Sequence, residues 1–135
     1  MRMRNLFAAA MLPLLVSAAP APAPAGPELT ALAGLQAGLW HVRMIGPGQP
    51  ERDVCVADPR QLMQLRHGGA ACDGLVVENQ ARLATLHYSC PAAGWGRTSL
   101  RLGRSGLVHI DSQGIADNAP FAFAAEAKRT GDCAK

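Results

Sequence analysis

Residues 97–111, RTSLRLGRSGLVHID, carry the pattern from which we infer the fold class. In residues 97–102, threonine and leucine alternate with arginine and serine, which is typical of a strand with one buried and one solvated face. Residues 103–106, GRSG, form a turn signal, and residues 107–111 resume the alternation with valine and isoleucine on one face. Two alternating segments joined by a short glycine-bounded turn predict an antiparallel hairpin.

The same period of two recurs on both sides of this hairpin. Glycine, proline and asparagine residues bound these segments, as expected for strand ends. Further strands are predicted at residues 40–44, 54–56, 75–77, 85–90 and 121–127. Six or seven short strands at this spacing predict a mainly β fold: an antiparallel meander curled into a sheet or partial barrel, with one short helix and two disulfides.

The short helix is expected directly after the second strand. Asp58 is a typical N-cap residue, and Pro59 suits the first helical position. Apolar residues within 62–65 supply a buried stripe, and Gly68-Gly69 ends the helix. Residues 28–37 are compatible either with a short helix or with an extended lead-in.

Four cysteines, Cys55, Cys72, Cys90 and Cys133, lie within the predicted domain. An even number of cysteines in a small exported domain predicts two disulfides. Their spacing lacks the close pairs of a metal or redox site. Of the three connectivities that four cysteines allow, we favour Cys55–Cys72 with Cys90–Cys133, because the first pair closes a compact local unit.

The N-terminus reads as a secretory signal peptide over residues 1–18. Arg2 and Arg4 supply its positive region, Leu6 to Val16 its apolar region, and small residues precede a cut after Ala18. The apolar run is shorter than the roughly 20 residues that span a bilayer. We therefore expect a periplasmic or secreted protein with no stable membrane span after cleavage.

Residues 19–34 form a predicted Pro/Ala-rich tether and lead-in, and residues 35–135 the disulfide-linked β domain. The whole chain has 13 basic and 10 acidic residues; without Arg2 and Arg4 the balance is 11 to 10, a net charge of +1. No polybasic face remains, so we expect no nucleic-acid partner.

Two terminal motifs resemble those of a known family. LQAGLWHVR (35–43) resembles the opening, and AKRTGDC (127–133) the closing motif, of domain-of-unknown-function family 3617, a family of small exported bacterial proteins. Three cysteines fall between these motifs in the family's order, although Thr130 stands where an apolar residue is common. The resemblance implies an exported β-rich domain with paired cysteines and supplies no catalytic residue.

The polar residues contain no recognisable catalytic or metal-binding motif. The histidines at 41, 67, 87 and 109 form no HxH, HxxxH or HExxH pattern. We therefore expect no metal, no cofactor and no enzymatic activity. The alternative is a small hydrolase that uses surface histidine, aspartate and serine residues, such as His109 and Asp111 with a nearby serine.

The favoured function is that of a noncatalytic envelope module that binds a ligand or a partner, or has a structural role. A small apolar ligand would lie in the mouth of the curled sheet, where Phe121 and Phe123 are further candidate lining residues. An envelope protein would instead contact an exposed apolar patch near the 91–96 loop. Arginines on a shared sheet surface would favour an anionic lipid or a polysaccharide. The residues predicted to contact ligand or partner are Trp40, Tyr88, Trp95, Arg97 and Arg101.

Overall fold

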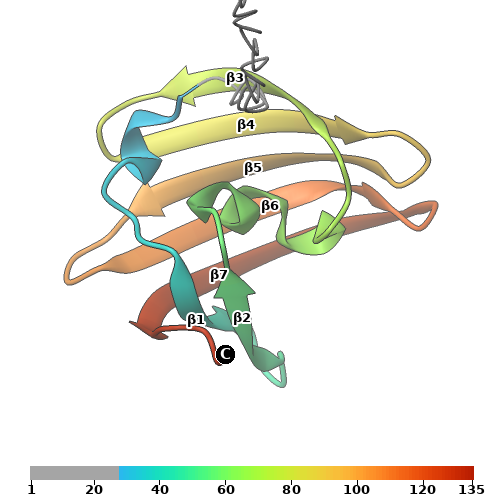
Figure 1. The fold of residues 1–135 in the computed structure, drawn as a ribbon. Helices are drawn as coiled ribbons and strands as arrows, with labels where there is room; N and C mark the ends of the chain where they lie inside the picture. The colour runs from blue at the N-terminus through green and yellow to red at the C-terminus, as the bar shows by residue number, and fades with distance from the viewer. Residues whose placement is uncertain (1–27) are drawn as a thin grey trace, which may run out of the picture.

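The computed structural model describes residues 28–135; the predicted signal peptide and residues 19–27 of the tether lie outside this range. Within these described residues, seven strands and two 3₁₀ helices follow one another (Figure 1). They are η1 (Thr30–Leu32), β1 (Gly38–Met44), β2 (Glu51–Val56), η2 (Pro59–His67), β3 (Asp73–Asn79), β4 (Leu83–Cys90), β5 (Gly94–Leu102), β6 (Leu107–Ala116) and β7 (Ala119–Gly131). The predicted mainly β fold is confirmed. None of the helices in these residues is long and apolar enough to cross a membrane.

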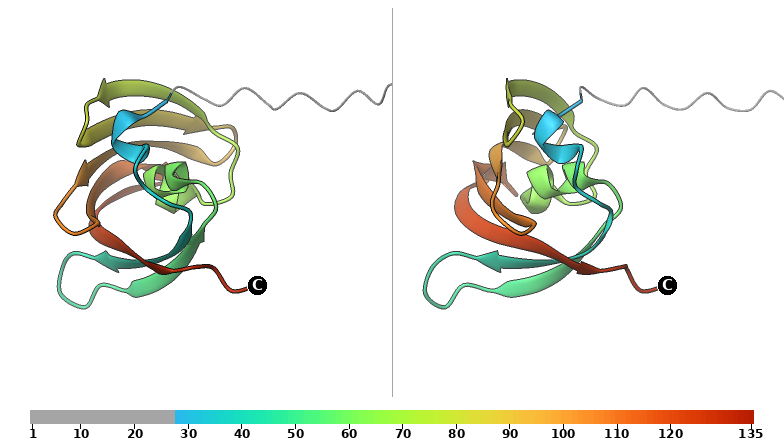
Figure 2. Two further views of the ribbon diagram at one scale, coloured as in Figure 1. Left: turned by 60° about the vertical axis from the view of Figure 1, so that its left-hand side comes forward. Right: turned by 90° about the vertical axis from the view of Figure 1, so that its left-hand side faces the viewer.

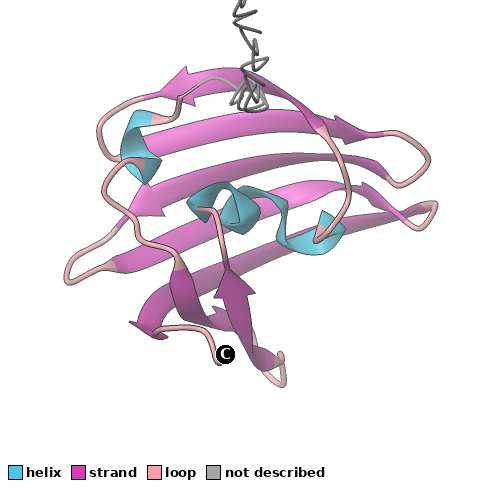
Figure 3. Cartoon of the chain, viewed as in Figure 1, coloured by secondary structure: helices cyan, strands magenta, loops and turns pink. Residues whose placement is uncertain are grey.

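All seven strands belong to one antiparallel sheet with the order β2-β1-β7-β6-β5-β4-β3. Strands β3 to β7 form the predicted meander, and the β1–β2 hairpin adds to it because β1 pairs with β7. The sheet curls around η1 and η2, which lie on its concave side (Figures 2 and 3). It does not close into a barrel, because β2 and β3 remain its two edges.

The core lies between the concave face of the sheet and the two helices. Alternate strand residues point inward, as the period of two predicts, while η2 adds Leu62 and Met63. The lead-in also contributes Leu29 and Leu32, so the packed part of the chain includes η1. The largest fully buried strand side chains are Trp40, Val42, Val56, Tyr88, Leu100, Val108 and Ile110.

The helix predicted after Asp58 is present and ends, as expected, at Gly68-Gly69. The Asp58 carboxylate accepts a hydrogen bond from the Arg60 amide (2.9 Å), and the Gln61 side chain accepts one from the Ala57 amide (2.7 Å). These contacts satisfy backbone donors that would otherwise lack partners at a helix start. The helix is of the 3₁₀ type, with a kink at Gln64.

Two disulfides are present, as predicted, but the predicted pairing of the cysteines is wrong. The bridges are Cys55–Cys133 and Cys72–Cys90, rather than Cys55–Cys72 and Cys90–Cys133. Cys72 directly precedes β3 and Cys90 ends β4. Because these neighbouring strands are antiparallel, their opposite ends meet, and the two cysteines lie side by side.

The other bridge follows from the pairing of β1 with β7. Leu39 of β1 lies opposite Cys55 of β2 and also opposite Gly131 of β7. The chain after β7 therefore has only one strand to cross before Cys133 reaches Cys55. The connection from β2 through η2 to β3 runs from one edge of the sheet to the other, which separates Cys55 from Cys72 despite their closeness in sequence.

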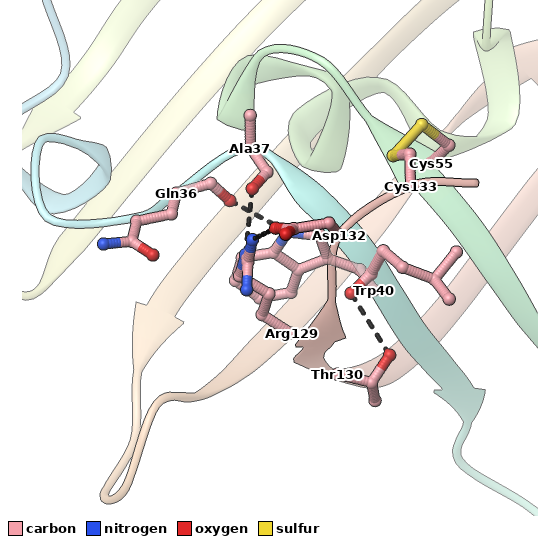
Figure 4. A network of polar contacts seen from close by, with 9 residues as sticks. Gln36, Ala37, Trp40, Cys55, Arg129, Thr130, Asp132 and Cys133 are labelled. Carbon is pink, nitrogen blue, oxygen red and sulfur yellow. Dashed lines mark hydrogen bonds and ion pairs between the residues drawn. A yellow bond between two sulfur atoms is a disulfide. The ribbon is translucent and has the colours of Figure 1, made fainter. Parts of the chain in front are cut away.

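The segments that carry the family resemblance lie side by side, since one forms β1 and the other β7. Arg129 Nε donates to the Ala37 carbonyl (2.9 Å), and Trp40 Nε1 donates to the Gln36 carbonyl (3.1 Å) (Figure 4). A Cβ at Gly38 would lie 2.6 Å from Arg129 Nε, so only glycine leaves room for the guanidinium there. The Arg129 bond joins the segment before β1 to the end of β7, whereas the Trp40 bond fixes the indole against the segment that precedes its own strand.

Candidate binding cleft at the mouth of the sheet

A cleft of about 360 Å³ opens at the mouth of the curled sheet. Its walls are the turn between β1 and β2, the end of η2 and the start of β7. The lining residues are Met44, Gln49, Pro50, Arg52, Leu65, Arg66, Phe121 and Phe123. The cleft thus has apolar walls and two arginines, a composition typical of small-molecule sites.

Phe121 and Phe123 form the aromatic wall of this cleft. Both face the concave side of β7, and their rings stack with centroids 6.0 Å apart. Gly114 lies opposite Phe121 on β6, and without a side chain it cannot cover that ring. Both phenylalanines therefore remain half-buried. The structure thus places at the mouth the two phenylalanines that the sequence suggested for it.

Behind this wall lies a buried polar pair that the sequence did not reveal. His67, the last residue of η2, packs edge-on against Phe121 with ring centroids 5.8 Å apart. Its Nε2 contacts the carbonyl oxygens of Ala93 (3.1 Å) and Ile115 (3.0 Å), so Nε2 carries the proton and donates. Its Nδ1 then accepts a hydrogen bond from the Tyr88 hydroxyl (3.0 Å).

Tyr88 is completely buried, and burial raises the pKa of its hydroxyl above the usual 10.0. Hydrogen bonds from Thr98 and Ser112 oppose that rise in pKa. Gly96 makes room for the phenol, because a Cβ there would lie 2.3 Å from the Tyr88 oxygen. The neutral His67–Tyr88 pair is a satisfied hydrogen-bonded unit that holds η2 on the sheet and supports the wall of the cleft.

Two arginines stand at the rim of the cleft. Arg52 of β2 donates to the Leu65 carbonyl (3.3 Å), which holds its guanidinium across the opening. Arg66, in the last turn of η2, is exposed. Within residues 28–135, no carboxylate forms an ion pair with either guanidinium. Both cations are therefore available to an anionic group.

A second hollow of about 650 Å³ lies next to the cleft and shares Arg52 and Leu65 with it. It runs between β2 and residues 68–71, where glycine and alanine leave the space unfilled. The two hollows meet at Arg52 and Leu65, which are hydrogen-bonded to each other, so a ligand that reaches from one hollow into the other has to pass this pair.

The residues predicted to contact a ligand fall into two groups. Trp40 and Tyr88 are 2% and 0% exposed and belong to the core, so they do not line an open site. Trp95, Arg97 and Arg101 are exposed on the convex face, opposite the cleft. The sequence pattern indicated the strand faces of Trp40, Tyr88, Arg97 and Arg101, but not that η2 fills the concave side. Trp95, expected in a loop over residues 91–96, instead lies within β5.

Within residues 28–135, no histidine is hydrogen-bonded to both a carboxylate and a serine. His41 lies 2.9 Å from Asp53 and 3.4 Å from Glu51, and the hydrogen bond to Asp53 is the main cause of its raised pKa. His109 lies 3.6 Å from Glu126. Among the hydrogen bonds of the described chain none joins a serine to a histidine, and residues 28–135 hold no group of three potential metal ligands.

Comparison of the chain with protein-family models, with curated proteins and with solved structures finds no match. The resemblance carried by residues 35–43 and 127–133 therefore stays a prediction.

Proposed function

We propose that this protein is a noncatalytic binding module of the cell envelope that takes a small amphipathic anion in the cleft at the mouth of its sheet. The observation that carries the proposal is the half-buried stack of Phe121 and Phe123 beside two arginines with which no carboxylate of residues 28–135 forms an ion pair. An apolar chain would pack on the rings, and its anionic head would meet Arg52 and Arg66.

The size of the cleft supports a small ligand. Its volume lies near the lower end of the roughly 300–1,000 Å³ that is usual for small-molecule sites. The adjoining hollow beside Gly68-Gly69 extends the space along the same wall. A medium-length acyl chain with a carboxylate or a similar acidic head has the shape and polarity that these two hollows offer.

The export signal and the disulfides support a periplasmic setting. Two disulfides in so small a domain suit an oxidising compartment. The N-terminal residues carry the three parts of a signal peptide. In the envelope, such a module would meet acyl chains released from lipids.

The proposal is tested by calorimetric titration of the oxidised protein with dodecanoate. Phe123→Ala should weaken binding about tenfold, because about 1.5 kcal/mol of apolar contact is lost. Leu75→Ala is the matched control: Leu75 is 68% exposed and lies on β3, away from the cleft. Equal affinities for the two variants, or no heat with the wild-type protein, would contradict the proposal.

A second series of titrations distinguishes the contribution of the anionic head group to binding from that of the apolar chain. The double substitution Arg52→Gln with Arg66→Gln should weaken dodecanoate binding but leave binding of dodecanol, the neutral analogue, unchanged. Arg104→Gln, in the exposed β5–β6 turn, is the control and should alter neither. Loss of both ligands in the double variant would refute the role assigned to the arginines.

A further inference from the structure

A second candidate site lies on the convex face of the sheet, opposite the cleft. Alternate residues of β5 and β6 point outward there, and a groove of about 580 Å³ runs across β5, β6 and β7. Ala122 and Ala124 of β7 form a low floor, and Ile45 forms one side wall. Neither helix covers this face, since both lie on the concave side (Figure 2).

The indole ring of Trp95 lies next to the groove, and its orientation is fixed by a neighbouring histidine. Trp95 of β5 is 40% exposed, and its indole stacks on His87 of β4 with centroids 5.5 Å apart and planes at 26°. His87 thus fixes the orientation of the indole while part of the ring stays open to solvent. Trp95 and Arg97 are two residues apart on the same face, which places them about 7 Å apart along the strand.

The polar side chains around the groove are free to bind. Arg97, Asp111 and Gln113 are exposed, and within residues 28–135 no side-chain hydrogen bond or ion pair engages any of them. Gln113 lies directly opposite Arg97 on the neighbouring strand, and Asp111 lies one row further along. A guanidinium, an amide and a carboxylate therefore surround one hollow beside an aromatic platform.

This combination matches the chemistry of a sugar that carries a carboxylate. The flat C–H face of a pyranose packs on an aromatic ring, its hydroxyl groups need planar donors and acceptors, and a carboxylate forms two parallel hydrogen bonds with arginine. Arg101 is also exposed on this face, and no carboxylate of residues 28–135 forms an ion pair with it, so the surface has a cationic excess over Asp111. We propose that the convex face of β5–β6 binds an acidic oligosaccharide, with Trp95 as the stacking platform and Arg97 as the carboxylate-binding residue.

An anionic membrane surface is the competing occupant, and the face fits it less well. Binding to lipid head groups needs a cluster of basic residues, each worth about 1 kcal/mol near the surface. Here Asp111 and Gln113 lie among the arginines, and an alanine floor leaves a hollow where a flat lipid surface would make little contact.

The test is a titration with tetragalacturonate, with maltotetraose as the neutral sugar and phosphatidylglycerol vesicles as the lipid. Tetragalacturonate should bind and change the emission of the exposed Trp95, whereas Trp40 is 2% exposed and shielded. Maltotetraose should bind at least about tenfold more weakly, because it lacks the carboxylates that Arg97 recognises.

Two substitutions and two matched controls locate the site. Trp95→Ala and Arg97→Gln should each weaken tetragalacturonate binding at least about tenfold. Val77→Ala, at another exposed apolar residue, and Arg104→Gln, at another exposed arginine, should each change it less than about twofold. Within residues 28–135 the Arg97 side chain forms no ion pair, and no side-chain hydrogen bond involves it, so the effect of Arg97→Gln on binding can be interpreted even where Trp95→Ala lowers the melting temperature.

The proposal is overturned if tetragalacturonate does not bind at about 10 mM, if the control substitutions weaken it as much as the site substitutions, or if the vesicles bind in place of the sugar. It does not depend on the mouth cleft. Phe123→Ala with dodecanoate tests that site separately, so either proposal can fail without the other.

Discussion

Replacing Gly96 by alanine should destabilise the protein severely, because this glycine makes room for Tyr88. A Cβ at residue 96 would lie 2.3 Å from the Tyr88 oxygen and 2.4 Å from Cζ, both far inside contact distance. Tyr88 is 0% exposed, so its ring has no free space into which to move. Any displacement of the ring also breaks the hydrogen bond to His67 Nδ1.

The magnitude follows from these two effects. Overpacking a core typically costs about 1–3 kcal/mol. A buried acceptor that loses its partner, here His67 Nδ1, costs about 1–3 kcal/mol more. Alanine lowers the entropy of the unfolded chain and returns about 0.4–1 kcal/mol. We expect a loss of about 3 kcal/mol in the free energy of unfolding, a large part of the roughly 5–15 kcal/mol of a typical domain.

The assay is urea unfolding of the oxidised protein, with Gly34→Ala as the control. A Cβ at Gly34 would meet no atom within 4 Å, so this substitution should change the stability by less than about 0.5 kcal/mol. In a Tyr88→Leu background, Gly96→Ala should cost at least about 1 kcal/mol less, since the atoms that it meets are gone. A Gly96→Ala protein as stable as the wild type would refute the packing described around Tyr88.

Three further predictions concern the bridges and the surface. Replacing Cys72 and Cys90 by alanine should lower the free energy of unfolding by about 3 kcal/mol. Removing the Cys55–Cys133 bridge, which closes a longer loop, should lower it by about 4.5 kcal/mol. Urea unfolding measures both losses, and equal or reversed losses would count against the pairing. The pKa of His41 is raised above 6.5, so its contribution to stability is complete below pH 6.5 and is lost as the pH rises through the pKa of the folded state. An NMR titration of the imidazole should show the raised pKa, and Asp53→Asn should lower it. Arg129→Gln should lower the free energy of unfolding by about 1–2 kcal/mol through the bond lost to the β1 lead-in, and an unchanged urea midpoint would argue against that bond.

Much of the fold could be predicted because apolar and polar residues alternate with a period of two in a half-buried antiparallel strand. Residues 97–102 and 107–111 show this alternation clearly, and both segments lie in strands with the expected buried faces. The helix after Asp58 was predictable because its cap is a local signal. The disulfide pairing was not, since it depends on β1 pairing with β7, a contact between residues about ninety positions apart.

The site was predictable only in part for the same reason. The alternation placed Phe121 and Phe123 on one strand face, both were candidate lining residues of the mouth, and both line the cleft. His67 was missed because its partners come from three separate places: β4, the turn after it and β6, at sequence separations of 21, 26 and 48. A lone histidine before two glycines gives no local sign of such partners. The position of η2 decides which inward-facing aromatic side chains remain accessible to solvent. The periodicity of the sequence does not indicate where η2 packs.

Intermolecular nuclear Overhauser contacts between dodecanoate and the oxidised protein test most directly whether the mouth cleft holds the apolar chain of an anionic amphiphile. We expect contacts from the methylene protons to the rings of Phe121 and Phe123 and to the Leu65 side chain, all of which line the cleft. Contacts confined to Leu75 and Trp95 on the convex face, or no contacts at a saturating concentration of dodecanoate, would contradict this expectation.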